Sequence, residues 1–299
     1  MAVQRVEELF KGALQSRFDL EIIVTDNAST DSTWIVAQSL AKTRPHLKAY
    51  QFSRNFGYQN SVFTGLFLAT GDAVIEMDAD LEDPPEVIPE FLQKWEEGYQ
   101  VAYGVRRIRH AAWWLKFLFS AFYKVLNKLS DLSIPENSGD FRLMDRKVVD
   151  VLKALPERNL YLRGLVTFLG FRQVAVPYDR QPRISGQSKF RMFHYFTLAV
   201  DALTAFTKTP LRLMTILGGA LFVGSMLLAS YYLISAILYG TPMPGFPTLV
   251  VLMLFLHSIT LIFLGVIGEY LSRIFDDAKH RPRVIIADAI HDPEFPKYL

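Results

Sequence analysis

Two aspartates, Asp78 and Asp80, stand directly after the apolar segment Ala73–Met77. If that segment is a strand, an Asp-x-Asp at its end projects two carboxylates toward one point at the edge of a sheet. Such hard oxygen ligands suit Mg²⁺ or Mn²⁺, and the ion then shares its coordination with substrate phosphates. A solvent-exposed acidic turn would contain the same two residues. The strand before them and the prolines Pro84 and Pro85 after them favour the metal site.

Residues 1 to 190 alternate between segments typical of helices and segments typical of buried strands. The sequence predicts helices over Val3–Leu14, Thr33–Thr43 and Gly57–Ala69, and strands over Leu20–Thr25, His46–Phe52 and Ala73–Met77. This alternation predicts an α/β fold with a mostly parallel, Rossmann-like sheet covered on both faces. Ligands of such sheets bind beyond the carboxyl ends of the strands, which is where the acidic residues fall.

A long stretch without Asp, Glu, Lys or Arg runs from residue 213 to residue 268. Within it, Leu213–Tyr239 and Phe246–Leu271 are each long enough to cross about 30 Å of hydrocarbon as helices. The residues between them, 240–245, are rich in Gly and Pro and indicate a turn. We therefore expect a two-span transmembrane hairpin. The alternative is a buried helical hairpin in a large soluble protein.

Basic residues flank this hairpin at its two outer ends only. Lys208 and Arg212 precede the first span, Arg273 and Lys279 follow the second, and the connecting turn has no basic residue. By the positive-inside rule both ends of the hairpin lie in the cytoplasm. The first residues of the chain are charged and show no signal peptide. The sequence thus predicts a multi-pass protein with both termini in the cytoplasm.

Two further segments mix aromatic with basic residues, as helices in the headgroup layer do. They are Ala111–Leu129 and Phe190–Leu211, and for both the alternative is an ordinary core helix packed on the sheet. The predicted organisation has four parts: an N-terminal domain (1–190), an interfacial helical segment (191–212), the two-span hairpin (213–271) and a cytoplasmic tail (272–299).

Composition excludes several functions. The chain has no Cys, so disulfides, thiolate metal sites and cysteine nucleophiles are ruled out. It has 32 Lys and Arg against 30 Asp and Glu, a formal net charge of +2, which gives no support for nucleic-acid binding.

Four motifs together resemble a known enzyme family. In chain order they are Ser53-Arg54-Asn55-Phe56-Gly57, Asp78-Ala79-Asp80, Gly139-Asp140-Phe141-Arg142-Leu143 and Arg183-Ile184-Ser185-Gly186-Gln187-Ser188-Lys189. This set is similar to that of the family 2 glycosyltransferases that load a sugar onto a polyprenyl phosphate, such as dolichol-phosphate mannose synthases and bacterial undecaprenyl-phosphate glucosyltransferases. The two-span hairpin matches the bacterial branch. The resemblance covers about residues 3 to 285.

The resemblance implies a GT-A-type fold and a metal-dependent hexosyltransferase of the bacterial inner membrane and cell envelope. Such an enzyme moves a sugar from a nucleotide sugar to undecaprenyl phosphate with inversion, and the resemblance favours UDP-glucose as the donor. Its catalytic domain lies in the cytoplasm. Its cofactor is Mg²⁺ or Mn²⁺, and its partners are the donor, the lipid acceptor and the membrane. Whether the chain forms a homo-oligomer is left open.

The resemblance also implies a role for each motif residue. Asp78 and Asp80 match the acids that bind the metal and the diphosphate, with Asp80 also counted as catalytic. Asp140 matches a catalytic acid near the donor sugar, and a structural turn acid is the alternative. Asp26 falls in the segment that contacts the nucleotide. Arg183 and Lys189 match a basic loop that engages the phosphates, and a solvated linker is the alternative.

Departures from the family concern the start of the chain. Relatives open with an apolar strand that ends in Pro-x-Tyr-Asn-Glu and contacts the nucleobase, whereas this sequence begins in the following helix. That strand lies in the middle of the family's sheet, so its loss leaves two neighbouring strands with unpaired backbone groups. We expect a start codon assigned too far downstream, and a genuinely shortened chain is the alternative. The alternative function is a catalytically inactive, membrane-anchored interaction module. Asn27 and Glu82 also differ from the residues in many relatives.

Overall fold

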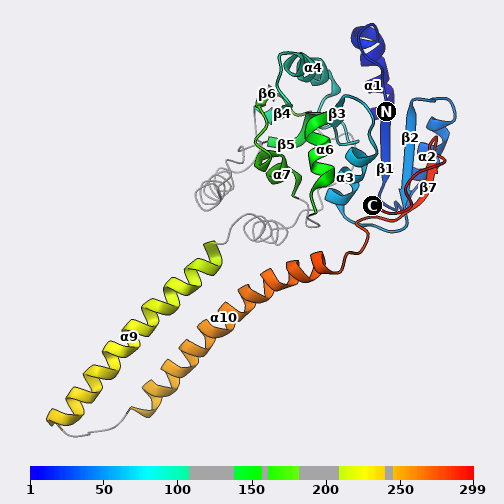
Figure 1. Cartoon of the computed structure of the whole chain (residues 1–299). Helices are drawn as coiled ribbons and strands as arrows, with labels where there is room; N and C mark the ends of the chain where they lie inside the picture. Colours follow the sequence, from blue (N-terminus) through cyan, green and yellow to red (C-terminus); the bar gives the residue numbers. More distant parts are fainter. Residues whose placement is uncertain (108–137, 157–160, 182–208, 240–244) are drawn as a thin grey trace.

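The computed structural model describes residues 1–107, 138–156, 161–181, 209–239 and 245–299. A domain of helices and two small sheets carries a hairpin of two long helices that points away from it (Figure 1). Both ends of the chain lie in the domain, so the chain leaves it for the hairpin and then returns. The predicted segment Ala111–Leu129 lies outside the described residues, as does most of Phe190–Leu211.

One sheet is built from strands that come from both ends of the chain. It contains β1 (Ile22–Asp26), β2 (Leu47–Phe52) and β7 (Ile286–Ile290), in the order β1-β2-β7. β1 and β2 are parallel, and β7 pairs antiparallel with β2. The predicted cytoplasmic tail, 272–299, is therefore no separate appendage, because its strand completes a sheet of the domain.

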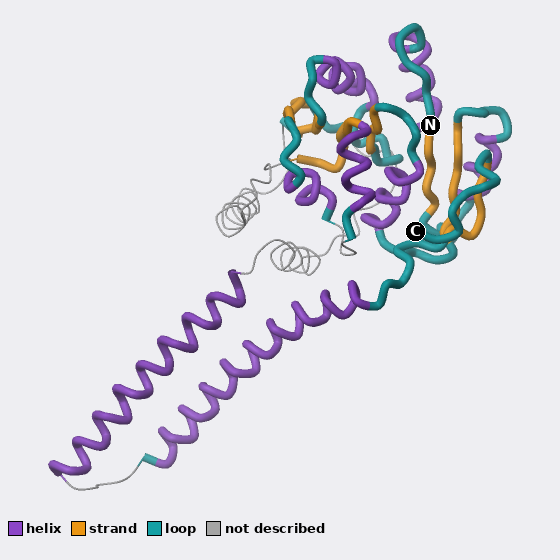
Figure 2. Tube along the Cα trace, in the orientation of Figure 1, coloured by secondary structure: helices purple, strands orange, loops and turns teal. Residues whose placement is uncertain are grey.

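The second sheet holds the strand that precedes Asp78. It contains β3 (Ala73–Glu76), β4 (Val101–Arg106), β5 (Ser138–Asp145) and β6 (Gln173–Tyr178), in the order β3-β5-β4-β6. β5 runs antiparallel to both β3 and β4, whereas β4 and β6 are parallel. Figure 2 shows the two groups of strands apart from each other.

Helices cover both faces of the second sheet. The helices of the domain are α1 (Ala2–Leu9), the π-helical turn η1 (Phe10–Leu14), α2 (Thr33–Ala41), α3 (Tyr58–Leu68), the 3₁₀ turn η2 (Pro85–Val87), α4 (Ile88–Glu96), α6 (Arg146–Ala154) and α7 (Leu162–Phe168). Successive strand residues point to opposite faces. Val101 and Met144 accordingly pack with α3, α6 and α7, whereas Ala102 and Leu143 pack with α4 on the other face.

The predicted α/β class is confirmed, and all six predicted segments form the expected type of element within two residues of the expected bounds. The sheets are mixed, however, where a mostly parallel sheet was predicted. The alternation that supported parallel strands ends at Met77, and β5, which lies beyond it, enters antiparallel between β3 and β4. Among the described strands, β1 and β3 each pair on one side only.

The hairpin consists of α9 (Thr209–Tyr239) and α10 (Phe246–Ala278). Both helices are long and apolar enough to cross a membrane, over Leu211–Leu228 and Phe255–Ala278, and neither stretch is buried in the protein. Large apolar side chains on both helices are open to the surroundings; Ile237, for example, is 74% exposed. A helix that is apolar all round and unburied is unusual for a soluble protein and typical of a membrane span.

Candidate active site

Tyr58 brings two of the predicted carboxylates together. Gly57, with φ of +92°, lets the chain turn sharply into α3, and Tyr58 is the first residue of that helix. The Tyr58 hydroxyl donates a hydrogen bond to Asp78 Oδ1 at 3.0 Å and also interacts with Asp140. Burial, followed by the charges of Asp140 and Asp78, raises the pKa of Tyr58. The phenol therefore stays protonated and serves as a donor between the two carboxylates.

Asp140 accepts two hydrogen bonds from an arginine on another element. Arg163, on α7, donates from Nε to Asp140 Oδ1 at 2.6 Å and from its Nη2 to Oδ2 at 2.8 Å. Arg142 lies 3.7 Å from the same carboxylate. Burial raises the pKa of Asp140, but the hydrogen bonds and charge of Arg163 and the charge of Arg142 outweigh it, so the pKa lies below its usual value. Asp140 is thus a fixed negative charge and a poor proton donor.

The pKa of Asp78 is shifted the other way, above its usual value. Burial comes first among the effects that raise its pKa, and the charges of Asp140, Asp80 and Asp83 add to it, although Tyr58 lowers it in part. The carboxylates at the end of β3 therefore repel one another. A cation bound between Asp78 and Asp80 would relieve that repulsion.

The turn that carries Asp80 is tightly held. Glu82 donates its backbone N–H to Asp80 Oδ1 at 3.1 Å, and Leu81 between them is buried with φ of +58°. A left-handed conformation at Leu costs about 1–2 kcal/mol, so packing must impose this turn. One Asp80 oxygen thus takes part in the turn, which fixes where this carboxylate lies.

Asp78 and Asp80 fit a divalent cation that keeps open positions. Within the described part of the chain, no group of three or more His, Cys, Asp or Glu side chains is placed to hold a metal ion. Mg²⁺ binds through one or two carboxylates together with waters and substrate phosphates, so a pair of aspartates is enough. The donor set therefore suits Mg²⁺ or Mn²⁺ that arrives with a phosphorylated substrate.

Asp83 ties the acidic turn to the end of β6. Its carboxylate is 1% exposed and accepts a hydrogen bond from the Tyr178 hydroxyl, while Arg106 and Arg180 lie at 3.5 and 3.8 Å from it. Arg180 also forms an ion pair with Glu82. The predicted phosphate-binding residues Arg183 and Lys189 lie outside the described residues. What the structure does fix is the start of their segment, because the Gln181 N–H donates to the Glu82 carbonyl at 2.9 Å.

Asp26 lies in the other sheet, at the end of β1. It is 2% exposed, and both its oxygens accept hydrogen bonds, from the Ser29 N–H at 3.1 Å and the Gln51 amide at 3.2 Å. Next to it, Asn27 binds the Asn55 side chain and accepts from the Phe56 N–H, both at 2.9 Å. This loop is therefore fixed to the turn that leads into α3. A contact between Asp26 and a nucleotide stays a prediction.

Sequence reasoning missed Tyr58 and Arg163. Tyr58 follows the Ser53–Gly57 motif directly, and that position was the available signal. Arg163 lies 23 residues from Asp140 in the sequence and belongs to no motif, so only the packing of α7 against the sheet reveals it.

Glu76, the last residue of β3, is a buried carboxyl group whose raised pKa makes the stability of the protein depend on pH. It is 7% exposed, without a hydrogen-bond partner among the described residues, and 3.7 Å from Arg142. Burial, with the charges of Asp140 and Asp78 and against that of Arg142, raises the pKa of Glu76 to about 8. The folded protein thus holds a proton that the unfolded chain releases near its ordinary pKa of 4.5. Stability is therefore present below that value and lost as the pH rises toward 8.

Glu76→Gln should remove this loss. We expect the Tm of the variant to match the parent near pH 5 and to exceed it increasingly up to pH 8.5. Thermal unfolding would be followed in detergent with a chelator present, because a bound cation at Asp78 would lower the pKa of Glu76. Parallel Tm curves for the two proteins would contradict the prediction.

Comparison with known proteins identifies the family. The profile of the glycosyl transferase family 2 matches residues 2–152. A bactoprenol glucosyl transferase of Shigella phage SfV is 41% identical over 272 residues, which span 90% of this chain and 88% of that protein. The chain belongs to glycosyltransferase family 2. The resemblance drawn from the four motifs is thereby confirmed, and the protein is an enzyme, a glycosyltransferase.

Further proteins are similar to this chain over most of its length. An uncharacterized glycosyltransferase of Synechocystis is 40% identical over 288 residues, 95% of this chain and 91% of that protein. A prophage bactoprenol glucosyl transferase homolog of Escherichia coli is 38% identical over 270 residues, 90% of this chain and 88% of that protein. A solved mannosyltransferase of Pyrobaculum calidifontis, in complex with GDP-Man and Mn²⁺, is 18% identical with a TM-score of 0.46 and covers 93% of this chain and 82% of that chain.

Proposed function

We propose that this glycosyltransferase moves a glucosyl group from UDP-glucose to undecaprenyl phosphate at the cytoplasmic face of a bacterial plasma membrane. The observation that carries the proposal is the Tyr58 hydroxyl between Asp78, at the end of β3, and Asp140, which Arg163 keeps ionised. The relatives named bactoprenol glucosyl transferases support the sugar and the lipid. The apolar helices α9 and α10 support the membrane location.

The site's own residues would handle the donor. Asp78 and Asp80 would hold a divalent cation, which when bound neutralises charge on the leaving diphosphate. Tyr58 orients Asp78 and keeps it beside Asp140. Asp140, held ionised by Arg163, would stabilise the positive character that develops at the anomeric carbon. Arg183 and Lys189 are proposed to contact the phosphates, as a charge-assisted pair suited to that task.

The acceptor needs little activation. A phosphate monoester has a second pKa of about 6, so it is mostly dianionic and nucleophilic at neutral pH. Asp140 accordingly need not remove a proton, which agrees with its lowered pKa. A single displacement at the anomeric carbon inverts its configuration.

A transfer assay on the purified full chain tests this function. We expect label from UDP-[¹⁴C]glucose to enter the organic phase only when undecaprenyl phosphate is added. Labelled GDP-mannose, used as the donor in its place, should give no labelled lipid. The alternative, an inactive interaction module, predicts no transfer from any sugar nucleotide. Transfer to a water-soluble acceptor alone would refute the lipid assignment.

The proposed topology is tested separately by cysteine labelling, because the chain contains no Cys of its own. Thr241→Cys lies in the turn between the spans, and Ser272→Cys lies near the end of α10. We expect a membrane-impermeant maleimide added to spheroplasts to label the first variant, and the second only after permeabilisation. The opposite labelling pattern would invert the topology.

A further inference from the structure

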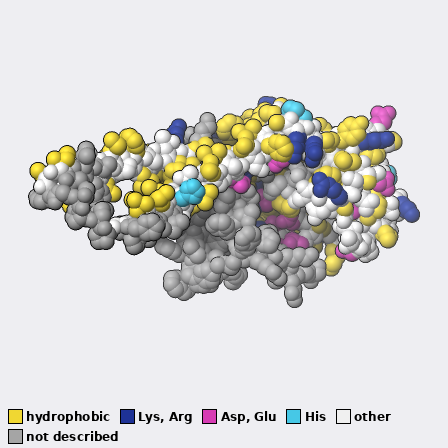
Figure 3. Space-filling model, turned by 90° about the horizontal axis from the view of Figure 1, so that it is seen from below, with side chains coloured by type: hydrophobic (Ala, Val, Ile, Leu, Met, Phe, Trp, Pro, Cys, Tyr) yellow, Lys and Arg dark blue, Asp and Glu magenta, His cyan; other side chains and the backbone are white. Residues whose placement is uncertain are grey.

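A basic groove lies where α10 rejoins the domain. It has a volume of about 350 Å³ and is formed by the turn before α3 together with the end of α10 and the residues after it. The lining residues are Arg54, Asn55, Phe56, Asn60, Asp276, Lys279, Arg281, Pro282 and Arg283. Figure 3, seen from the side of the hairpin, shows Lys and Arg side chains gathered where the apolar helices meet the domain.

Aromatic rings hold three of these cations in place. The Arg54 guanidinium lies 4.5 Å from the centre of the Phe56 ring, and the Lys279 ammonium lies 3.8 Å from that of Phe275. Arg283 stacks on Phe63 at 4.5 Å and donates to the Leu155 carbonyl at 2.9 Å, which anchors the segment to the domain. Rings of this kind fix a cationic head without neutralising its charge.

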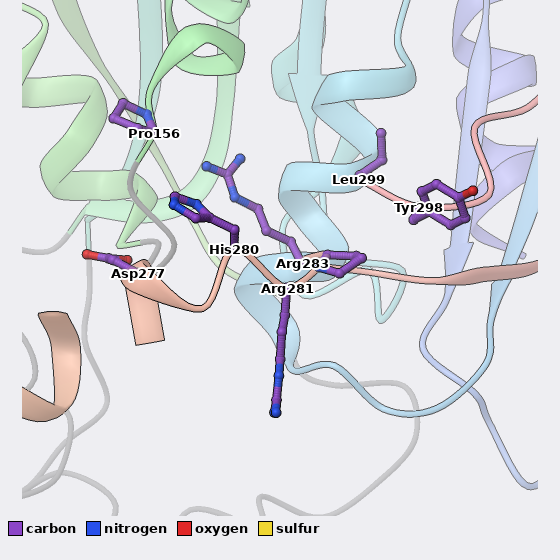
Figure 4. Close-up of a pocket in the computed structure, with 8 residues that line it drawn as sticks. Pro156, Asp277, His280, Arg281, Arg283, Tyr298 and Leu299 are labelled. Carbon is purple, nitrogen blue, oxygen red and sulfur yellow. The ribbon is translucent and has the colours of Figure 1, made fainter. Parts of the chain in front are cut away.

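The groove carries excess positive charge. Four basic side chains line it against one acidic side chain, Asp276. Among the described residues, no ion pair joins Arg54, Lys279 or Arg281 to a carboxylate. Figure 4, a close-up of an adjoining pocket, shows Arg281 extending away from Arg283, which reaches back toward the domain. Arg281 is exposed, so a ligand can reach it.

We propose that this groove binds the phosphate of a lipid headgroup. The inference rests on the proposed membrane location, since Lys279 directly follows α10, just beyond the predicted span that ends at Leu271, and so lies near the headgroups. Arginine and lysine together recognise a phosphate, the arginine by paired N–H groups and the lysine as a point charge. Asp78 and Asp80 are acidic and would repel the same group without a cation, so the groove is a distinct site.

The groove is coupled to the active site through one short segment. Arg54 lines the groove, and Tyr58, four residues later, donates to Asp78. A phosphate bound at Arg54 would therefore order the turn that positions Tyr58. Two lipids could supply it, an anionic phospholipid of the bilayer or undecaprenyl phosphate itself.

Native mass spectrometry of the full chain in detergent would measure retention of each lipid without requiring turnover. Phosphatidylglycerol and undecaprenyl phosphate would be added separately, with phosphatidylcholine as the neutral reference. We expect Arg54→Ala/Arg281→Ala to weaken retention of at least one of the anionic lipids about tenfold or more, as loss of charge-assisted contacts does. Arg172→Ala is the matched control, because Arg172 also stacks on a ring, that of Tyr99 at 4.6 Å, far from the groove in sequence.

A second variant tests the groove even if the first variant misfolds. Asp276→Asn removes the one acidic side chain from the exposed rim and should strengthen retention. Loss confined to phosphatidylglycerol would identify a bilayer lipid, and loss confined to undecaprenyl phosphate would identify the acceptor. Equal retention by the parent, the double variant and Asp276→Asn would overturn the proposal. Lipid retention is measured without sugar transfer. A protein that transfers no sugar could therefore still bind the lipid, and the proposed groove and the proposed transferase function can be refuted independently.

Discussion

Asp80→Asn should lower kcat/KM for sugar transfer by at least about a hundredfold, which corresponds to about 2.7 kcal/mol of lost transition-state stabilisation. The amide keeps an oxygen that can accept the Glu82 N–H, so the turn is preserved. What it loses is the negative charge that would hold the cation. We therefore expect folding and membrane insertion to be unchanged while Mn²⁺ affinity, measured by electron paramagnetic resonance, falls in parallel with activity.

Glu86→Gln is the matched control for that substitution. Glu86 is an exposed acid in the same segment and forms an ion pair with Arg5 at the surface. Its replacement by the isosteric amide should leave transfer within about twofold of the parent, since exposed ion pairs contribute little. If Asp80→Asn also retained nearly full activity, or if excess chelator left the parent unaffected, Asp80 would have no metal role.

The acidic half of the site, Asp78 and Asp80, was accessible from the sequence because its signals are local. A strand, two aspartates and two prolines lie within Ala73–Pro85, so the end of β3 could be predicted before any folding was considered. The helices and strands up to Met77 were predictable for the same reason, since their hydrophobic patterns are complete within each segment.

The rest depends on contacts between distant segments. β7 joins β2 across more than two hundred residues, and its short polar-and-apolar sequence gave no sign of a partner. The antiparallel entry of β5 is likewise a property of the assembled sheet. Arg163 resembles any other surface arginine until α7 packs beside Asp140. Long-range pairing of this kind leaves no period in the sequence.

Arg163 accordingly offers the sharpest test of how the second half of the site works. Arg163→Ala removes both guanidinium hydrogen bonds to Asp140 and leaves it the Tyr58 hydroxyl and Arg142, which lies 3.7 Å away. Loss of a charge-assisted contact should lower kcat by roughly 10- to 150-fold. Arg163→Lys should recover part of this loss, because a single ammonium cannot reproduce the paired guanidinium contact. Arg172→Ala, an exposed arginine elsewhere, should match the parent.

The pH profile separates this positioning role from a merely structural one. Arg163 lowers the pKa of Asp140, so its removal should raise that pKa, and Asp140 would then take up a proton at a higher pH than in the parent. If ionised Asp140 stabilises the anomeric carbon, the acid limb of kcat in Arg163→Ala moves to higher pH, and the deficit is larger at pH 6 than at pH 8. Asp140→Asn, which has no proton to gain, should be strongly impaired without that limb. A deficit in Arg163→Ala that is the same at every pH would mean that Arg163 only supports the fold.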